Sequence, residues 1–400
     1  MALTDMKIVV IGAGIGGLAV ARACALRGAD VTVLEQAEAI KEVGAGLQIS
    51  PNGFAVLRAL GLGDAVTDAS VRAEAVALHD YRRGQVVRLD LTQLASRDYF
   101  FTHRADLIDL LAAGARAAGV KIRLLQKVDA ITPGTTPRVD LANGASVTAD
   151  LVIGADGLNS RLRPVLNGRS APFFTRQVAW RGVVPNRAGR GPEAHVHMGP
   201  HRHVVSYPLR GGDMLNIVAV QERAAWASES WSQKDDPVAV QAAFGDFCPE
   251  VRDMLGAIET VNLWGLFRHP VAPIWHREGT ALLGDAAHPT LPFLAQGASM
   301  ALEDAWVLAD ALSTDLPRDQ ALQSYQARRE ARVRRVVAAA NGNARKYHLS
   351  LPPLRWAAHA ALHLGGALAP VRMMRQFDWL YGHDVTDCAG QASSSTQIGT

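Results

Sequence analysis

The chain has 400 residues, of which 48% are hydrophobic and 20% are charged, and its formal net charge is +3. This composition supports a large core and excludes a disordered protein, and the small charge argues against a nucleic-acid-binding protein. Cys24, Cys248 and Cys388 are too few and too far apart for a disulfide framework or a zinc site, and they fit the reducing cytosol. We therefore expect a cytosolic globular protein, and the length alone suggests two or three compact units.

Residues 7–35 predict a strand, a glycine turn, a helix and a second strand. Gly12, Gly14 and Gly17 form G-x-G-x-x-G directly after an apolar run, a spacing that allows a tight turn, a close approach to a pyrophosphate and close helix packing. Glu35 ends the second strand, where a carboxylate accepts hydrogen bonds from ribose hydroxyls. The segment predicts a site for an adenine dinucleotide, without distinguishing NAD from FAD. The alternative is a βαβ unit whose glycines serve only packing.

Two later segments repeat the pattern of an apolar strand followed by glycine and aspartate. Residues 149–157 end with Asp156, and residues 280–288 contain Asp285 after a similar strand. Because ligands of open α/β sheets lie beyond the carboxyl ends of the strands, we expect both carboxylates near the bound dinucleotide. The three segments therefore predict one domain assembled from separated parts of the chain.

The sequence between these segments alternates between apolar and polar residues. Residues 71–91 predict a hairpin, and residues 178–220 predict further antiparallel strands without a phosphate-binding loop. We interpret these segments as an inserted antiparallel sheet that forms the wall of a substrate pocket.

The remaining segments are expected to be helical or disordered. Residues 297–345 predict helices, with the basic stretch 328–335 on a solvated face. Residues 355–370 predict a C-terminal helix packed on the body or on a partner. A contact of that last helix with a membrane surface is the alternative. We reject a signal peptide at the N-terminus because the glycine motif interrupts its apolar run, and no apolar run is long enough to cross a membrane.

Among the residues of these segments, Asp285 gives the most specific indication of a ligand. A carboxylate at the end of a parallel strand can bind a polyol, and a helix that begins near Gly297 would direct its positive end at an anionic group. This combination suits a reduced flavin ring better than a nicotinamide. The alternative is an aspartate that caps a structural loop.

With these motifs the chain resembles the group A flavoprotein aromatic hydroxylases, of the salicylate, 3-hydroxybenzoate and 6-hydroxynicotinate monooxygenase type. Three motifs match in order: the opening glycine motif, D-G-x-x-S-x-x-R at 156–163, and Gly284-Asp285 followed by residues 288–297, HPTLPFLAQG. The resemblance covers roughly residues 5–345. It implies bound FAD, with NADH or NADPH and O2 as co-substrates, and hydroxylation of a small aromatic substrate through a flavin C4a-hydroperoxide.

The resemblance implies a fold and its boundaries. The fold class is α/β, with a Rossmann-like FAD-binding domain, an inserted antiparallel β-sheet substrate domain and C-terminal helices. The FAD-binding domain comprises residues 1–70, 98–177 and 276–345, and the substrate domain residues 71–97 and 178–275. Residues 346–390 form a C-terminal helical segment, and residues 391–400 form a disordered tail.

The resemblance also implies which residues contact FAD. Glu35 would bind the adenosine ribose, Arg104 the pyrophosphate and Asp285 the ribityl chain, while Gly297 and Ala298 lie at the pyrimidine end of the flavin. The full expected set is Gly12, Gly14, Ile15, Gly16, Gly17, Glu35, Gly46, Arg104, Val128, Asp156, Asp285, Gly297 and Ala298.

His203 and Tyr207 are the candidates for substrate chemistry. They lie four residues apart on a predicted strand and so on one face, and an imidazole there can accept a phenolic proton. Relatives of the hydroxybenzoate and hydroxynicotinate type carry a similar pair. Gln48, Pro292 and Phe293 are expected in the substrate pocket, and Gln48 and Phe293 replace more polar residues of some relatives, which favours a larger or more apolar aromatic substrate.

Other polar residues near these candidates are assigned structural roles. His288 is expected to serve its loop, and Trp180 and Arg181 to support the sheet. His195, His197 and His201 alternate with His203, but no acid or cysteine accompanies them in the sequence, so we predict no metal site.

Several alternatives stay open at this stage. A related oxygenase for a polyketide or quinone precursor, a nicotinamide-dependent dehydrogenase without FAD, and a non-catalytic flavin-binding module share parts of the pattern. The only partner expected is the small aromatic substrate, with no nucleic acid and no integral membrane segment. The oligomeric state is not readable from the sequence, and a homodimer is one option.

Overall fold

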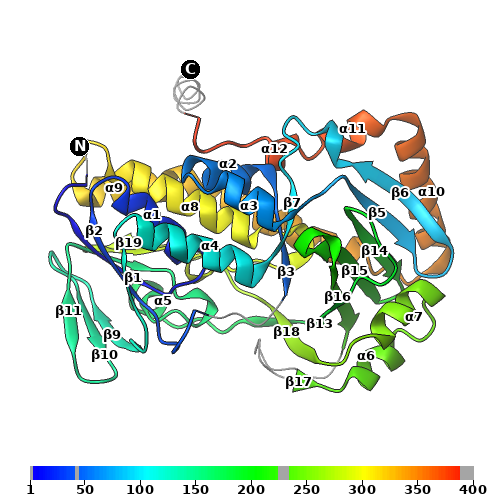
Figure 1. Ribbon diagram of the computed structural model, residues 1–400, viewed down its shortest axis with the longest axis horizontal. Coiled ribbons are helices and arrows are strands. Elements are labelled where there is room, and N and C mark those ends of the chain that lie inside the picture. The colour runs from blue at the N-terminus through cyan, green and yellow to red at the C-terminus, as the bar shows by residue number, and fades with distance from the viewer. Residues whose placement is uncertain (1–2, 41–44, 224–233, 388–400) are drawn as a thin grey trace.

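The computed structural model describes residues 3–40, 45–223 and 234–387, and only the backbone of residues 343–346. Figure 1 shows a parallel sheet with its helices at one end of the molecule and a larger, mainly antiparallel sheet at the other. Cys388 and the predicted disordered tail lie outside the described residues.

The parallel sheet brings the three predicted strand segments together. β1 pairs in parallel with β2 and β12, and β12 pairs in parallel with β20. Its central strands β1, β12 and β20 are largely buried because helices cover the sheet, whereas the edge strands β8 and β19 are more exposed, and α1 packs against both α4 and α8. The elements are β19 (His276–Arg277), β20 (Thr280–Leu282), β12 (Leu151–Gly154), β1 (Lys7–Ile11), β2 (Asp30–Leu34) and β8 (Lys121–Arg123) in sheet order, with α1 (Ile15–Ala25), α4 (Arg104–Ala117) and α8 (Gly297–Leu312).

The second large sheet has eight strands and agrees with the predicted inserted sheet, except that β5 and β14 are parallel. The predicted hairpins are confirmed as β5–β6 and β15–β16. In sheet order the strands are β17 (Lys234–Asp235), β18 (Val261–Arg268), β13 (Phe173–Pro185), β16 (Met214–Glu222), β15 (Arg202–Leu209), β14 (Glu193–Gly199), β5 (Ala75–Asp80) and β6 (Gly84–Asp90). β13 spans the predicted domain boundary between residues 177 and 178.

Two smaller sheets accompany the two large ones. β3 (Gly46–Ile49), β7 (Phe100–His103) and β4 (Val71–Arg72) form one small sheet, and β9 (Val128–Thr132), β10 (Arg138–Leu141) and β11 (Ser146–Thr148) form another that the sequence analysis did not predict. The remaining short helices are α2 (Pro51–Ala59), α3 (Gly63–Ala69), α5 (Leu162–Asn167), α6 (Pro237–Ala243) and α7 (Pro249–Gly256), with 3₁₀ turns η1 (Leu91–Gln93), η2 (Gly157–Asn159), η3 (Arg210–Gly212), η4 (Gly284–Ala286) and η5 (Pro292–Leu294).

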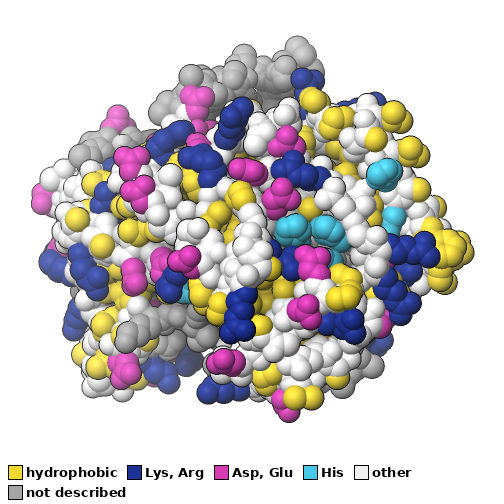
Figure 2. Space-filling view, turned by 45° about the vertical axis from the view of Figure 1, so that its right-hand side comes forward, with side chains coloured by type: hydrophobic (Ala, Val, Ile, Leu, Met, Phe, Trp, Pro, Cys, Tyr) yellow, Lys and Arg dark blue, Asp and Glu magenta, His cyan; other side chains and the backbone are white. Residues whose placement is uncertain are grey.

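The described chain from residue 318 onward is helical: α9 (Arg318–Lys346), α10 (Pro352–Leu368), α11 (Pro370–Arg375) and α12 (Asp378–Tyr381). α10 and α11 pack on β6, which confirms the expected packing of residues 355–370 on the body. Among the described residues, no helix has the length and apolar character needed to cross a membrane. Figure 2 shows acidic and basic side chains interspersed over one face of the molecule.

The prediction of a solvated face for residues 328–335 is wrong for two of its arginines. Arg329 is fully buried and pairs with Glu303 at 2.6 Å and Asp304 at 2.7 Å, and Arg332 pairs with Glu303 at 2.8 Å. The reason is that α9 packs along α8, which presents both carboxylates to it. Arg334, by contrast, is exposed as predicted.

Candidate active site

The glycine turn after β1 has the geometry that its motif requires. Gly12 has φ +100°, and a Cβ there would lie 2.6 Å from the carbonyl oxygen of Ala155. A Cβ on Gly17 would lie 2.0 Å from the carbonyl oxygen of Gly12, so both positions need glycine for backbone packing. A Cβ on Gly14 would meet no atom within 4 Å, so this part of the turn borders open space. A ligand can therefore approach the backbone at Gly14.

Glu35 lies beside this turn at the end of β2. Its carboxylate accepts hydrogen bonds from the N–H groups of Ala13 at 2.8 Å and Ala37 at 2.9 Å. These bonds hold the carboxylate at the edge of the glycine turn, in the position expected for a ribose contact.

A cavity of about 570 Å³ runs from this turn to the eight-stranded sheet. It brings together most of the predicted site residues, from both ends of the molecule. Its lining includes Gly14, Ile15, Gly16, Gly46, Gln48, Arg104, His203, Tyr207, Asp285, Pro292, Phe293, Gly297 and Ala298. Gly12, Gly17, Glu35, Val128 and Asp156 do not line it, and Val128 is buried in the main core.

Asp285 faces this cavity from the turn after β20. Its side chain is open to the cavity yet lies deep in the protein, and this desolvation raises the pKa of the carboxyl group, while His288 and Arg104 oppose the shift. The turn is clamped to α8, because Asp304 accepts hydrogen bonds from the Gly284 N–H at 3.1 Å and from His288 Nε2 at 2.6 Å. His288 therefore serves the loop, as the sequence analysis expected. α8 begins at Gly297, also as expected.

Asp156 and Arg163 connect the second motif to the third. The Asp156 carboxylate accepts a hydrogen bond from the Arg161 N–H at 2.7 Å, and burial raises its pKa. Arg163 donates hydrogen bonds to the carbonyl oxygens of Ala286 and Ala287 at 3.1 and 3.0 Å. The second motif thus supports the turn that carries Asp285.

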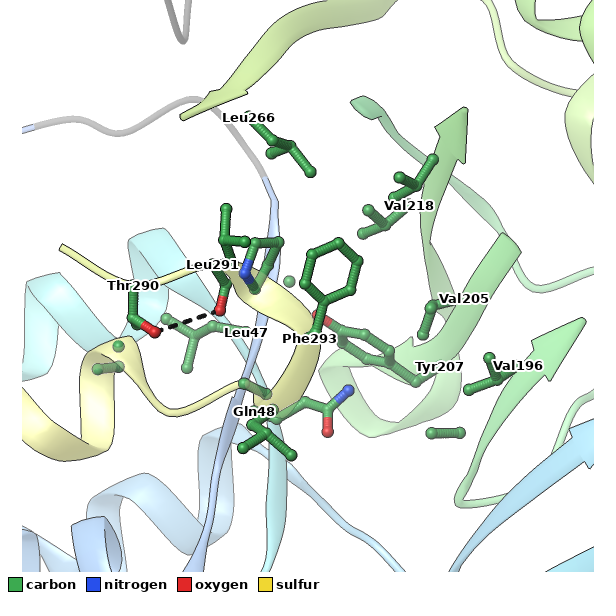
Figure 3. A pocket seen from close by; sticks show the side chains of 18 of the residues that line it. Leu47, Gln48, Val196, Val205, Tyr207, Val218, Leu266, Thr290, Leu291 and Phe293 are labelled. Carbon is green, nitrogen blue, oxygen red and sulfur yellow. Dashed lines mark hydrogen bonds between the residues drawn. The ribbon is translucent and has the colours of Figure 1, made fainter. Parts of the chain in front are cut away.

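His203 and Tyr207 share one face of β15 and line the cavity, as the strand periodicity predicted. Figure 3 shows Tyr207 from β15, Phe293 from η5 and Gln48 from β3 around it. Burial raises the pKa of Tyr207 well above its ordinary value, so its hydroxyl stays protonated. The Gln48 carbonyl accepts a hydrogen bond from the Tyr99 hydroxyl at 2.7 Å.

A chain of hydrogen bonds runs from His203 to the surface. His203 Nδ1 lies 2.7 Å from His348 Nε2, His348 Nδ1 lies 2.9 Å from Glu222 Oε1, and Glu222 Oε2 lies 2.7 Å from His201 Nδ1. His203 is buried, whereas the His201 side chain is 58% exposed. The chain therefore connects the cavity to solvent. We name these four residues the relay.

Two members of the relay, His203 and Glu222, differ in charge. Burial, assisted by His348, holds the pKa of His203 well below its ordinary value, so its imidazole is neutral. Hydrogen bonds from His348 and His201 lower the pKa of Glu222 to about 2, although burial acts against the shift. The relay thus joins a neutral base at the cavity to an ionised acid near the surface.

Most of the remaining cavity wall is apolar. The sequence analysis did not name these lining residues individually. Side chains from β5, β6, β14, α10 and α11 line the part beyond His203, and they include Val76, Leu78, Leu89, Val196, Met198, Leu362 and Met373. Arg181 also lines the cavity, with its guanidinium 4.2 Å from the centre of the Trp264 ring. Trp180 supports the sheet, as expected, because it is buried and donates to Asp235 at 2.7 Å.

The chain resembles known proteins over almost its whole length. Residues 5–340 match the family model described as an FAD binding domain. The chain is 34% identical over 409 residues to a 3-hydroxybenzoate 6-hydroxylase of Polaromonas naphthalenivorans, covering 96% of this chain and 98% of that protein. It is 33% identical to a 3-amino-4-hydroxybenzoate 2-monooxygenase of Streptomyces platensis, covering 94% and 96%.

A solved structure of Klebsiella pneumoniae HpxO, complexed with FAD and uric acid, has a similar fold. The TM-score is 0.82 at 27% sequence identity, and the match covers 93% of this chain and 96% of that chain.

Proposed function

We propose residue roles and a substrate class for this chain, which belongs to the FAD-binding-domain family of aromatic-ring monooxygenases. It is an FAD-dependent enzyme that hydroxylates a small phenolic or heteroaromatic compound with NAD(P)H and O2. The roles of individual residues and the nature of the substrate are the proposal.

The residues around the glycine turn and the cavity fit FAD. Gly14 leaves space for a pyrophosphate, Arg104 lines the cavity with a positive charge, and Asp285 presents a carboxylate to it. In this proposal Glu35 binds the ribose, Asp285 the ribityl chain, and the N–H groups that begin α8 the pyrimidine end of the ring. When bound, FAD supplies the reaction with NAD(P)H and the activation of O2.

The hydrogen bonds of the relay are the main support for the proposal that His203 deprotonates the substrate. Because the ionised Glu222 carboxylate only accepts hydrogen bonds, it requires the proton of His348 on Nδ1. His348 Nε2 is then an acceptor, so His203 Nδ1 donates to it and His203 Nε2 carries a lone pair. Gln177 also approaches His348 Nδ1, but at 3.4 Å this contact is longer than the 2.9 Å bond to Glu222.

This tautomer suits general-base catalysis. His203 Nε2 accepts the phenolic proton, Nδ1 passes a proton to His348 Nε2, and His348 Nδ1 passes one to Glu222, near the surface. Loss of the proton makes the aromatic ring more electron-rich and more reactive toward an electrophilic oxygen. Tyr207, which stays protonated, donates a hydrogen bond to the substrate oxygen and orients it.

The apolar wall beyond His203 indicates the shape of the substrate. Val76, Leu78, Val196, Met198 and Leu362 offer no hydrogen bond to a carboxylate or hydroxyl in that part of the cavity. A substrate that fills it needs an apolar substituent or a second ring next to its phenol. The same feature favours the second candidate, an oxygenase for a larger polyketide or quinone precursor. The homodimer and the cytosolic location stay predictions.

The test uses the purified yellow holoenzyme with NADH and NADPH separately. A panel of hydroxybenzoates and of phenols with lengthening alkyl groups is incubated under ¹⁸O₂, and oxygen incorporation is measured by mass spectrometry. We expect incorporation with a phenol, and tighter binding as the apolar substituent grows. Absence of labelled product across the panel contradicts the activity, whereas labelled product from hydroxybenzoates with exclusion of alkylphenols contradicts only the substrate class.

A further inference from the structure

A second group of histidines lies on the opposite face of the large sheet from the cavity. On β14, His195 and His197 alternate with Val196 and Met198, which line the cavity. His79 on β5 stands directly across from His197 in the parallel register, and their rings stack with centroids 4.7 Å apart. In Figure 2 this end of the molecule is turned toward the viewer, and histidine side chains lie close together on its surface.

The start of α7 brings a thiol and a carboxylate to His197. Cys248 precedes the helix, and Glu250 lies in its first turn. The Cys248 N–H donates to the carbonyl oxygen of Tyr81 at 2.7 Å, which attaches this end of α7 to the end of β5. We predicted no metal site from the sequence, and the nearest acid along the chain, Glu193, pairs with Arg88 instead. The fold supplies both the thiol and the carboxylate from a segment about fifty residues away.

The donor atoms of these three residues face one another. A ring nitrogen of His197, Cys248 Sγ and a Glu250 carboxylate oxygen all lie within 4.8 Å of one another. His197 Nε2 and Glu250 Oε2 are 3.9 Å apart, which is too long for a hydrogen bond. Two ligand bonds of about 2.0–2.1 Å at the tetrahedral angle place their donor atoms about 3.4 Å apart, so binding an ion requires these two side chains to approach by about half an ångström.

The His197 side chain is buried, with an exposed fraction of 1%.

We propose that His197, Cys248 and Glu250 bind one Zn²⁺ ion on the outer face of the sheet. A set of one nitrogen, one sulfur and one oxygen donor suits zinc, whereas magnesium and calcium prefer oxygen donors alone. Glu250 is half-exposed and Cys248 half-buried, so solvent can supply the fourth ligand.

Neighbouring side chains orient the ligands. Arg190 pairs with Glu250 Oε1, which leaves Oε2 directed at His197, and the stacked His79 holds the imidazole ring. The Arg190 charge opposes a cation, but the thiolate and the carboxylate together outweigh it. The ion would link α7 to β14 and would not contact the cavity.

The test uses the purified full-length holoenzyme, freed of metal with a chelator and then titrated with Zn²⁺ by calorimetry. We expect one ion per chain and a zinc-dependent rise in the melting temperature. X-ray absorption at the zinc edge should show one sulfur ligand near 2.3 Å and nitrogen or oxygen ligands near 2.0 Å.

Cys248→Ser and His197→Gln should each weaken zinc affinity by at least about 100-fold. The matched controls, Cys24→Ser in the parallel-sheet core and His363→Gln on α10, should keep the wild-type affinity. Affinity that survives Cys248→Ser, an absorption spectrum without sulfur, or no stoichiometric binding overturns the proposal. If a variant does not fold, as judged by circular dichroism and flavin content, the wild-type absorption spectrum alone decides.

Discussion

Two histidine groups lie on opposite faces of one sheet and differ in the partners that distant segments bring to them. His203 contacts His348, which bonds to Glu222, so its ring is connected through an acid to solvent. His197 stacks on His79 and has no acid within hydrogen-bond distance among the described residues. Burial lowers the pKa of both rings. The comparison teaches that burial makes either ring a neutral base, whereas the partner decides whether it can pass on a proton.

The largest expected effect follows from replacing the relay residue at the cavity. His203→Gln should lower the rate constant of ring hydroxylation by roughly 10²–10⁴-fold, the usual contribution of a general base, while FAD content stays unchanged. His195→Gln, on the other face, should change the rate by less than about twofold. Single-turnover product analysis and flavin absorbance measure both quantities. A parallel loss of flavin and rate would contradict the assigned role.

The next effect concerns stability in acid and belongs to His197. Its folded pKa of about 3 lies below the ordinary value of 6.5, so the unfolded chain binds more protons between these pH values. Stability contributed by the neutral ring is complete above pH 6.5 and is lost as the pH falls toward 3. In chelator-treated protein, stability should fall between pH 6.5 and 4, and His197→Leu should remove roughly 3 kcal/mol of this loss. Urea unfolding at several pH values measures this, and exposed His363→Leu is the control. An unchanged slope would show that the ring is not buried neutral.

Glu222→Gln should have a smaller effect, because it keeps the shape of the relay but removes its charge. A hydrogen bond to a charged group contributes about 1.5–3 kcal/mol, so the hydroxylation rate should fall about tenfold or more. Since the pKa of Glu222 is about 2, the wild-type carboxylate stays ionised, and the loss should be the same at every assay pH above about 5. Rate–pH profiles of both proteins check this. A rate equal to that of the wild type would exclude the relay as the proton path.

The smallest effect is expected at the exposed end of the relay. His201→Gln removes only a surface pair with Glu222, so the rate should fall by about twofold at most. Added buffer can accept the proton in its place, so the deficit should disappear at high buffer concentration. Initial rates over a buffer series make the measurement. A deficit larger than that of Glu222→Gln would mean that His201 acts elsewhere.

The positions of the turns that carry the proposed FAD contacts were predictable because these residues lie in contiguous motifs. The turns at Gly12, Asp156 and Asp285 each follow a strand directly, and the parallel sheet brings them together as expected. His203 and Tyr207 were predictable from the period of a strand. Each of these predictions needed only local sequence and one rule of sheet geometry.

The relay and the zinc site could not be predicted in the same way. His348, Glu222 and Cys248 reach their partners from other elements, and no local pattern marks such contacts. The error at Arg329 has the same origin, because its basic stretch is read as solvated until the carboxylates of α8 are placed beside it.

The last helices of the chain form part of the cavity wall. Leu362 from α10, Met373 and Met374 from α11, and Tyr381 from α12 all line it, whereas the cofactor-contacting residues proposed above are complete by Ala298. Synthesis proceeds from the N-terminus, so the ribosome produces the whole set of proposed cofactor contacts well before this side of the substrate chamber exists. The order of translation therefore separates the two halves of the site in time, and a nascent chain has its cofactor contacts before it can enclose a substrate.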